Sequence, residues 1–196
     1  YKQDPIGTLK TCYEGTLNIL ELTKKLNAKL LFASSSEIYG VSNKMPLSEE
    51  SLGIVNTLGD RSCYAEGKRI CETLCNEFIK KYYLDIKIVR IFNTYGPRMA
   101  FQDKRVISSF FESVLEKKDL IIYGNGSQTR SFCYIDDLID IFIKLINGKS
   151  HGPINIGSTE EVTIIELANL IKNKYYPQGE FIFEKPRIDD PFKRRP

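Results

Sequence analysis

Tyr64 and Lys68 are the first pair of residues whose types and spacing could do chemistry. They lie four residues apart in a stretch with helical apolar spacing, so both side chains share one helix face, one turn apart. The charge of a lysine ammonium near a phenol favours the phenolate, which can take a proton from a substrate hydroxyl. A tyrosine and a lysine at this spacing also occur on ordinary solvated helix faces, so the pair alone leaves both interpretations open.

A second group of reactive side chains follows an apolar run at residues 29–33. Ser34, Ser35, Ser36 and Glu37 come directly after this run. In a parallel sheet the carboxyl ends of the strands open into the ligand crevice, so a hydroxyl and a carboxylate here would face a ligand. The alternative is a serine-rich turn whose hydroxyls only cap the backbone.

The elements that would position these groups alternate along the chain. Apolar spacing predicts helices over residues 8–26, 64–82, 106–115, 135–146 and 164–175. Short apolar runs predict strands over residues 29–33, 86–92, 120–123, 153–156 and 181–183, the first of them buried on both faces. This alternation indicates an α/β fold with a parallel sheet flanked by helices.

The overall composition is that of an ordinary globular protein. Hydrophobic residues make up 42%, and the net charge of +3 is spread along the chain, which argues against nucleic acid or a membrane surface as partner. The five cysteines show no metal-ligand spacing, so we expect no metal site. Reduced thiols are favoured over a disulfide or zinc site, and Cys71 and Cys75 are expected on a buried helix stripe.

Four ordered motifs connect these observations. They are ASSSEIYG at 33–40, YAEGK at 64–68, RIFNTYGPR at 90–98 and YGNGSQTRSFCYIDDL at 123–138. Together they resemble the extended short-chain dehydrogenases/reductases that act on nucleotide sugars. The resemblance implies a doubly wound parallel sheet of the Rossmann type, lacking its first strands here, with a smaller substrate-binding part towards the C-terminus.

The residues around Glu37 narrow the resemblance to one branch. The family's 4,6-dehydratases place Asp-Glu where Ser36 and Glu37 stand, and its 4-epimerases usually carry a small or hydroxyl residue at the position of Glu37. Ser35-Ser36-Glu37 is similar to the UDP-glucuronate decarboxylases, which implies NAD-dependent conversion of UDP-glucuronate to UDP-xylose through a 4-keto intermediate. The alternatives are a 4,6-dehydratase, a 4-epimerase or a catalytically silent binding module.

The resemblance also implies roles for individual residues. The implied catalytic residues are Tyr64, Lys68, Ser35, Ser36, Glu37 and Arg194. The implied cofactor-binding residues are Thr11, Ala33, Tyr64, Lys68, Thr94 and Arg98. The implied substrate-binding residues are Lys10, Asn93, Arg105, Tyr123 and Arg130. For the binding residues, a surface cation or a loop-end polar side chain is the alternative interpretation.

The resemblance further implies a division of the chain. Residues 1–98 with 135–157 would form part of the NAD-binding domain, and residues 99–134 with 158–196 the nucleotide-sugar-binding part. No G-x-x-G-x-x-G turn occurs in these residues, so we expect them to bind NAD poorly by themselves. Helices 8–26 and 64–82 resemble the pair that forms a dimer contact, which predicts a homodimer. We expect a cytoplasmic enzyme, or a Golgi-lumen enzyme behind an N-terminal anchor.

Overall fold

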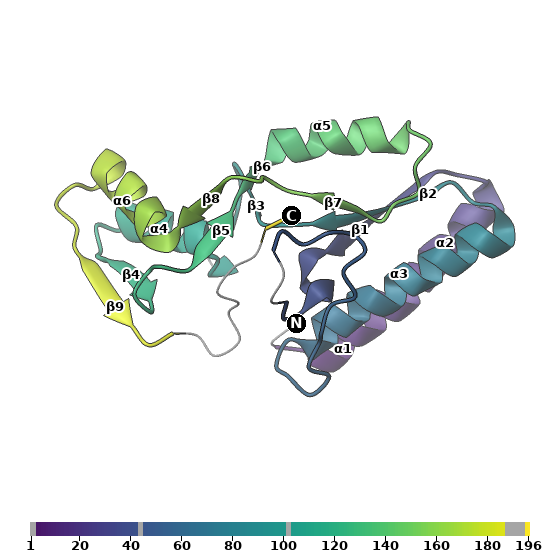
Figure 1. The fold of residues 1–196 in the computed structure, drawn as a ribbon, viewed down its shortest axis with the longest axis horizontal. Coiled ribbons are helices and arrows are strands. Elements are labelled where there is room, and N and C mark those ends of the chain that lie inside the picture. The colour runs from purple at the N-terminus through teal and green to yellow at the C-terminus, as the bar shows by residue number, and fades with distance from the viewer. Residues whose placement is uncertain (1–2, 43–44, 101–102, 187–194) are drawn as a thin grey trace.

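A three-stranded parallel sheet forms the centre of the larger part of the molecule (Figure 1). In this computed structural model the described residues are 3–42, 45–100, 103–186 and 195–196. The strands, in spatial order, are β1 (Leu30–Ser35), β2 (Ile86–Ile91) and β7 (Ile154–Ile156). Ser35 lies opposite Ile91, and Ile91 opposite Ile156, so the carboxyl ends of all three strands meet at one edge.

Helices cover both faces of this sheet, as the alternating pattern predicts. On one face lie α1 (Pro5–Lys10), the π-helical η1 (Thr11–Gly15), α2 (Thr16–Leu26) and α3 (Ser62–Tyr82). Helix α5 (Ile135–Ile146) lies on the other face (Figure 1). The core on the α2–α3 side contains Leu20, Cys75, Phe78, Leu84, Ile86 and Ile88, and the core under α5 contains Val89, Cys133, Leu138 and Ile156.

The predicted helix over residues 8–26 is present but is not one continuous α-helix. It begins at Pro5, because Asp4 accepts a hydrogen bond from the backbone N–H of Gly7 at 2.8 Å and proline suits the first helical position. A π-helical turn follows at Thr11–Gly15, where the Cys71 thiol donates to the Cys12 carbonyl at 3.0 Å. Apolar spacing could not show this turn, which lies in contact with α3.

Strand β1 corrects the expectation of burial on both faces. Phe32 contributes to the core on the α3 side and Leu31 to the core under α5, but both are only half-buried, and Ala33 is exposed. The reason is topological, because β1 is an edge strand of the described sheet. Ala33 is therefore exposed near the end of β1, whereas Ser34 and Ser35 at the end itself are buried.

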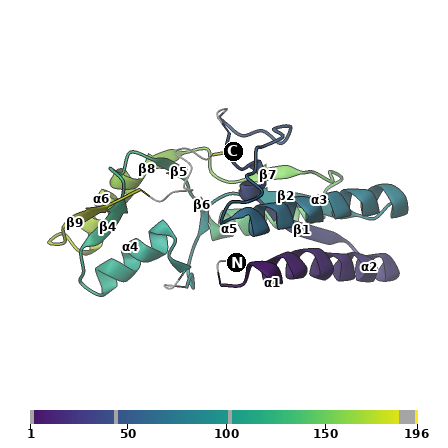
Figure 2. The same ribbon diagram turned by 90° about the horizontal axis from the view of Figure 1, so that it is seen from below.

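A second group of elements lies beyond the sheet. It contains α4 (Val106–Leu115), β4 (Leu120–Tyr123), β5 (Thr129–Ser131), β8 (Glu161–Thr163), α6 (Ile164–Tyr175) and β9 (Phe181–Glu184). Figure 2 shows α4, α6, β4 and β9 at one end of the molecule, with α1, α2 and α3 running side by side at the other. Strands β4 and β9 pair in parallel, and β5 and β8 pair antiparallel. Its core contains Phe110, Val114, Leu120, Ile122, Ile164, Ala168 and Ile171.

Several short elements were not predicted. Strands β3 (Thr94–Tyr95) and β6 (Cys133–Tyr134) pair in parallel. Strands β3 and β6 have two residues each, and β5 and β8 have three. Strands this short cannot show an alternating pattern. The helices over 106–115, 135–146 and 164–175 are confirmed with the predicted bounds, and α6 begins with a capping box between Thr163 and Glu166.

Cys75 gives the fold a measurable dependence on pH. All five cysteines are free thiols, and Cys75 is completely buried, which raises the pKa of its thiol to about 12. The unfolded thiol ionises from about pH 8.5, whereas the folded thiol stays neutral. The contribution of this thiol to the free energy of unfolding is therefore fully present below about pH 8.5. It is lost as the pH rises towards 12, by about 1.4 kcal/mol per pH unit. We expect the free energy of unfolding, measured by denaturant titration at increasing alkaline pH, to fall more steeply in the unaltered protein than in Cys75→Ala. Equal slopes would contradict this.

Candidate active site

The carboxyl end of β1 carries the first group of predicted site residues. Ser35 and Ser36 are buried, and Ser35 caps the short 3-10 helix η2 (Ser36–Tyr39). The Ser35 hydroxyl accepts a hydrogen bond from the backbone N–H of Glu37 at 3.2 Å. The capping interpretation of this serine-rich segment is thus confirmed for Ser35, and its hydroxyl nevertheless lies at the strand end where a ligand crevice is expected.

Helix α3 brings Tyr64 and Lys68 to the same place. The Lys68 ammonium donates a hydrogen bond to the backbone carbonyl of Ala33 in β1 at 2.9 Å. Its nitrogen lies 6.0 Å from the centroid of the Tyr64 ring and 5.2 Å from that of Phe32. The backbone of β1 and two aromatic faces therefore hold the positive charge close to the phenol.

Glu37 has a partner that sequence reasoning did not identify. The Arg61 guanidinium donates to both of its carboxylate oxygens, from Nη2 to Oε1 at 2.9 Å and from Nε to Oε2 at 3.2 Å. Arg61 comes directly before α3, three residues before Tyr64. The sequence signal for this contact was the position of Arg61, a basic residue just before the helix that carries the Tyr64–Lys68 pair.

A buried polar network behind the site was also missed. Arg90 of β2 binds both carboxylate oxygens of Glu72 in α3 and donates to the Tyr39 hydroxyl at 2.8 Å. The Tyr39 hydroxyl in turn donates to Asn155 of β7 at 2.7 Å, and the Ser34 hydroxyl donates to Glu72. The network therefore joins all three strands to α3 and η2.

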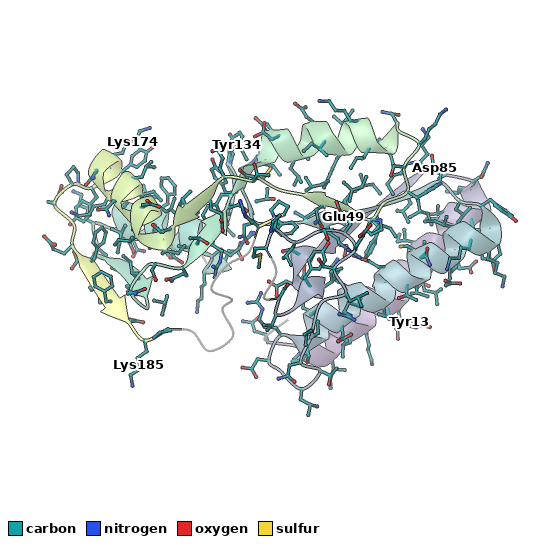
Figure 3. The ribbon with its side chains drawn as sticks, in the orientation of Figure 1. Tyr13, Glu49, Asp85, Tyr134, Lys174 and Lys185 are labelled. Atoms are coloured by element: carbon teal, nitrogen blue, oxygen red, sulfur yellow. The ribbon has the colours of Figure 1, made fainter. Side chains whose placement is uncertain are left out.

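Burial and hydrogen bonding both act on the charges of this network. Burial raises the pKa of Tyr39, and the guanidinium beside it only partly opposes this change. Burial disfavours the charge of Arg90, but its hydrogen bonds to Glu72 and Tyr39 outweigh that cost and raise its pKa. Glu49, labelled near the centre of Figure 3, extends the network, since it accepts from the backbone N–H of Asn155 at 2.8 Å.

Asn93 and Arg130 lie where the sheet meets the second group of elements. Asn93 follows β2 by two residues, and its side-chain amide donates to the Ser131 carbonyl at 3.5 Å. Arg130, next to Ser131 in β5, is buried, and its guanidinium donates to the Thr129 carbonyl at 2.7 Å. Two of the predicted substrate-binding residues are thus brought near each other.

The other predicted binding residues occupy separate places. Lys10 and Thr11 are exposed at the junction of α1 and η1, and Thr94 lies in β3. Arg98 is exposed in a turn. Arg105 precedes α4 and pairs with Asp103, and Tyr123 ends β4. Arg194 lies outside the described residues, so its role stays a prediction.

The residues at the end of β1 fit the nicotinamide end of NAD. An ammonium has three N–H donors, and the hydrogen bond described for Lys68 goes to the Ala33 carbonyl, so the group is anchored and still suited to ribose hydroxyls. The exposed Ala33 leaves room for a flat ring near the strand end, and the Tyr64 ring lies 6.0 Å from the Lys68 nitrogen that is bound there. Lys68, Tyr64 and Ala33 would hold this end of the cofactor.

Comparison with known proteins first identifies a family over most of the chain. Residues 1–157 match the NAD dependent epimerase/dehydratase family. The matched segment contains the strand end at Ser35, the Tyr64–Lys68 pair and the Asn93 and Arg130 positions, so the site described above lies within it.

Curated relatives match the whole chain. It is 44% identical to UDP-glucuronic acid decarboxylase 1 of Xenopus tropicalis, covering 100% of this chain and 47% of that protein. It is 45% identical to UDP-glucuronic acid decarboxylase 3 of Arabidopsis thaliana, covering 100% of this chain and 57% of that protein. The chain therefore spans about half the length of the curated relatives it matches.

Solved structures share the fold. UDP-glucose 4-epimerase of Thermotoga maritima, solved with UDP-glucose, superposes with a TM-score of 0.89 at 25% identity, covering 98% of this chain and 62% of that one. UDP-glucuronic acid 4-epimerase of Bacillus cereus, in complex with UDP-glucuronic acid and NAD, has a TM-score of 0.83 at 29% identity, covering 95% and 58%.

Proposed function

Because this chain belongs to the NAD-dependent epimerase/dehydratase family, we propose that it forms the catalytic part of an enzyme that decarboxylates UDP-glucuronate to UDP-xylose with bound NAD. The observation that carries the proposal is the assembly of Ser35, Glu37, Tyr64 and Lys68 around the carboxyl end of β1. A carboxylate two residues after the serine supplies a group that an epimerase does not need, and relatives at 43–45% identity are decarboxylases by name.

Oxidation at carbon 4 of the sugar begins the proposed reaction. When bound, NAD supplies the hydride acceptor for this oxidation and later the hydride donor for reduction. Tyr64, as phenolate, takes the proton of the 4-hydroxyl, and the nearby Lys68 ammonium stabilises the negative charge that the phenol must carry. Ser35 hydrogen-bonds the same oxygen and holds it as it becomes a ketone.

Loss of carbon dioxide follows from the position of that ketone. Ser35 and Tyr64 hold the ketone oxygen, and because the ketone lies beta to the sugar carboxylate, carbon dioxide can leave with the bonding electrons kept in an enolate. Glu37 is our candidate for orienting the sugar and delivering a proton to carbon 5, with Arg194 as the alternative. Tyr64 then returns its proton to the oxygen on carbon 4, which gives UDP-xylose without net oxidation.

The first test is incubation of the full-length protein with NAD and UDP-glucuronate. We expect carbon dioxide and UDP-xylose in equal amounts. Release of ¹³CO₂ from labelled substrate measures the first product, and chromatography of the nucleotide sugar measures the second. Formation of a 4-epimer without carbon dioxide would replace the proposal with an epimerase. Loss of water from the sugar would indicate a dehydratase, and no turnover by a folded, NAD-loaded protein would indicate a binding module.

We also propose that α1 and α2 contribute to a homodimer contact. The exposed apolar side chains on α1, η1 and α2 include Ile6, Leu9, Tyr13, Ile19, Leu22 and Leu26. Tyr13 is labelled in Figure 3. A run of exposed apolar side chains of this extent is typical of an interaction surface. We expect Leu22→Glu to shift the sedimentation coefficient from dimer to monomer, while Tyr83→Glu, at a more exposed position just after the end of α3, leaves it unchanged.

The cellular compartment stays a prediction, with the cytoplasm proposed and the Golgi lumen as alternative. Within the described part of the chain, no helix combines the length and apolar character needed to cross a membrane.

A further inference from the structure

The ion pair between Glu37 and Arg61 has the geometry of a bidentate guanidinium–carboxylate contact. Two separate hydrogen bonds, at 2.9 and 3.2 Å, join the guanidinium to both carboxylate oxygens. The Glu37 side chain is only 16% exposed, whereas the Arg61 side chain is 39% exposed. A two-point contact of this kind fixes the plane of the carboxylate, which a single hydrogen bond would leave free to rotate.

The pair joins the two segments that carry the site. The backbone carbonyl of Arg61 accepts from the N–H groups of Tyr64 and Ala65, both at 3.1 Å, so Arg61 is fixed to the first turn of α3. The backbone N–H of Glu37 donates to the Ser35 hydroxyl at 3.2 Å, so Glu37 is fixed to the end of β1. The Glu37–Arg61 contact therefore links the end of β1 to the start of α3.

We propose that Arg61 is a positioning residue, which holds the Glu37 carboxylate in the orientation needed to act on the sugar. The proposal rests on the proposed decarboxylase function. Arg61 acts through Glu37, because both described hydrogen bonds of its guanidinium go to that carboxylate. Lysine at this position could donate to one oxygen but could not reproduce the planar two-point contact.

The chain provides a matched control on the same helix. Arg69 lies two turns after Arg61, and its guanidinium donates to the backbone carbonyl of Ile38 at 3.1 Å and pairs with Glu66. It therefore supports the backbone of η2 next to Glu37, through its described contacts with Ile38 and Glu66. Substitution of Arg69 tests whether loosening this segment is enough to impair the site.

Steady-state kinetics of the full-length protein with NAD and UDP-glucuronate test the proposal. We expect Arg61→Met to lower kcat by about 100-fold, since a displacement near 1 Å of a reacting group has an effect of this size. KM should change by less than about threefold, because the substrate contacts remain. Arg61→Lys should recover part of the loss, and Arg69→Gln should keep kcat within about threefold. Thermal unfolding should stay within about 3 °C, since partly exposed ion pairs contribute little to stability.

A double-mutant cycle completes the test. If Arg61 acts through Glu37, Glu37→Gln combined with Arg61→Met is no slower than Glu37→Gln alone. Additive losses, a raised KM with unchanged kcat, or equal losses in Arg61→Met and Arg69→Gln would each overturn the inference while the decarboxylase function stands. Absence of carbon dioxide release by the unaltered protein would instead remove the proposed function, and the inference with it.

Discussion

Replacing Tyr64 with phenylalanine should lower kcat for UDP-glucuronate decarboxylation by roughly 10²- to 10⁴-fold, because it removes the group that exchanges a proton with the oxygen on carbon 4. The ring, its place in α3 and the Lys68 ammonium 6.0 Å from its centroid would remain. Release of labelled carbon dioxide under saturating substrate measures the loss, and the circular dichroism spectrum should be unchanged.

Tyr83→Phe is the matched control for this experiment. Tyr83 follows the end of α3, and 92% of its surface is exposed. The same chemical change there should leave kcat unchanged within experimental error. A Tyr64→Phe variant that keeps more than about a tenth of the normal kcat would show that another group transfers the proton.

Replacing Arg90 with methionine should destabilise the fold by about 3–5 kcal/mol, because the Glu72 carboxylate would be left buried without its guanidinium partner. Both side chains of this pair are almost buried, with exposed fractions of 11% and 12%. The Ser34 hydroxyl would still donate to Glu72 and the Tyr39 hydroxyl to Asn155, but neither neutral group can replace the positive charge of the guanidinium. Denaturant titration of the full-length protein measures the change in free energy of unfolding.

Two further variants separate this effect from the general loss of an ion pair. Lys80→Met breaks the exposed Lys80–Glu77 pair on the same helix and should change stability by less than about 1 kcal/mol. Arg90→Met with Glu72→Met removes both buried charges and should be less destabilised than Arg90→Met alone. If the double variant is the less stable of the two, an uncompensated charge is not the cause of the loss.

The sequence was sufficient for elements with a long apolar pattern. The helix over residues 64–82 and the strand over 86–92 were predicted nearly to their ends, because a buried face repeats several times within each. Strands β3, β5, β6 and β8 were missed because they have only two or three residues and none carries the two isoleucines that mark the equally short β7. The π-helical turn at Thr11–Gly15 was missed because apolar spacing carries no signal for a single π turn within a helical segment.

The site was predictable where motif residues themselves do the chemistry. Tyr64, Lys68, Ser35 and Glu37 were identified in advance, and the structure brings them together at the end of β1. The partners that hold them were not identified. Arg61, for example, reaches Glu37 across 24 residues of chain, and only the three-dimensional arrangement reveals such a contact.

The contact between η1 and α3 limits which side chains can occur together in the protein. A Cβ atom on Gly67 would lie 3.0 Å from the Cys12 sulfur and 3.1 Å from its Cβ, so the Cys12 side chain would have to shift slightly. Gly67 directly precedes Lys68, and Cys12 directly follows Thr11. The separation of η1 and α3 at this point is thus set by two small side chains. A larger residue at position 67 should be tolerated more easily when position 12 carries a smaller one, so the two positions should change together.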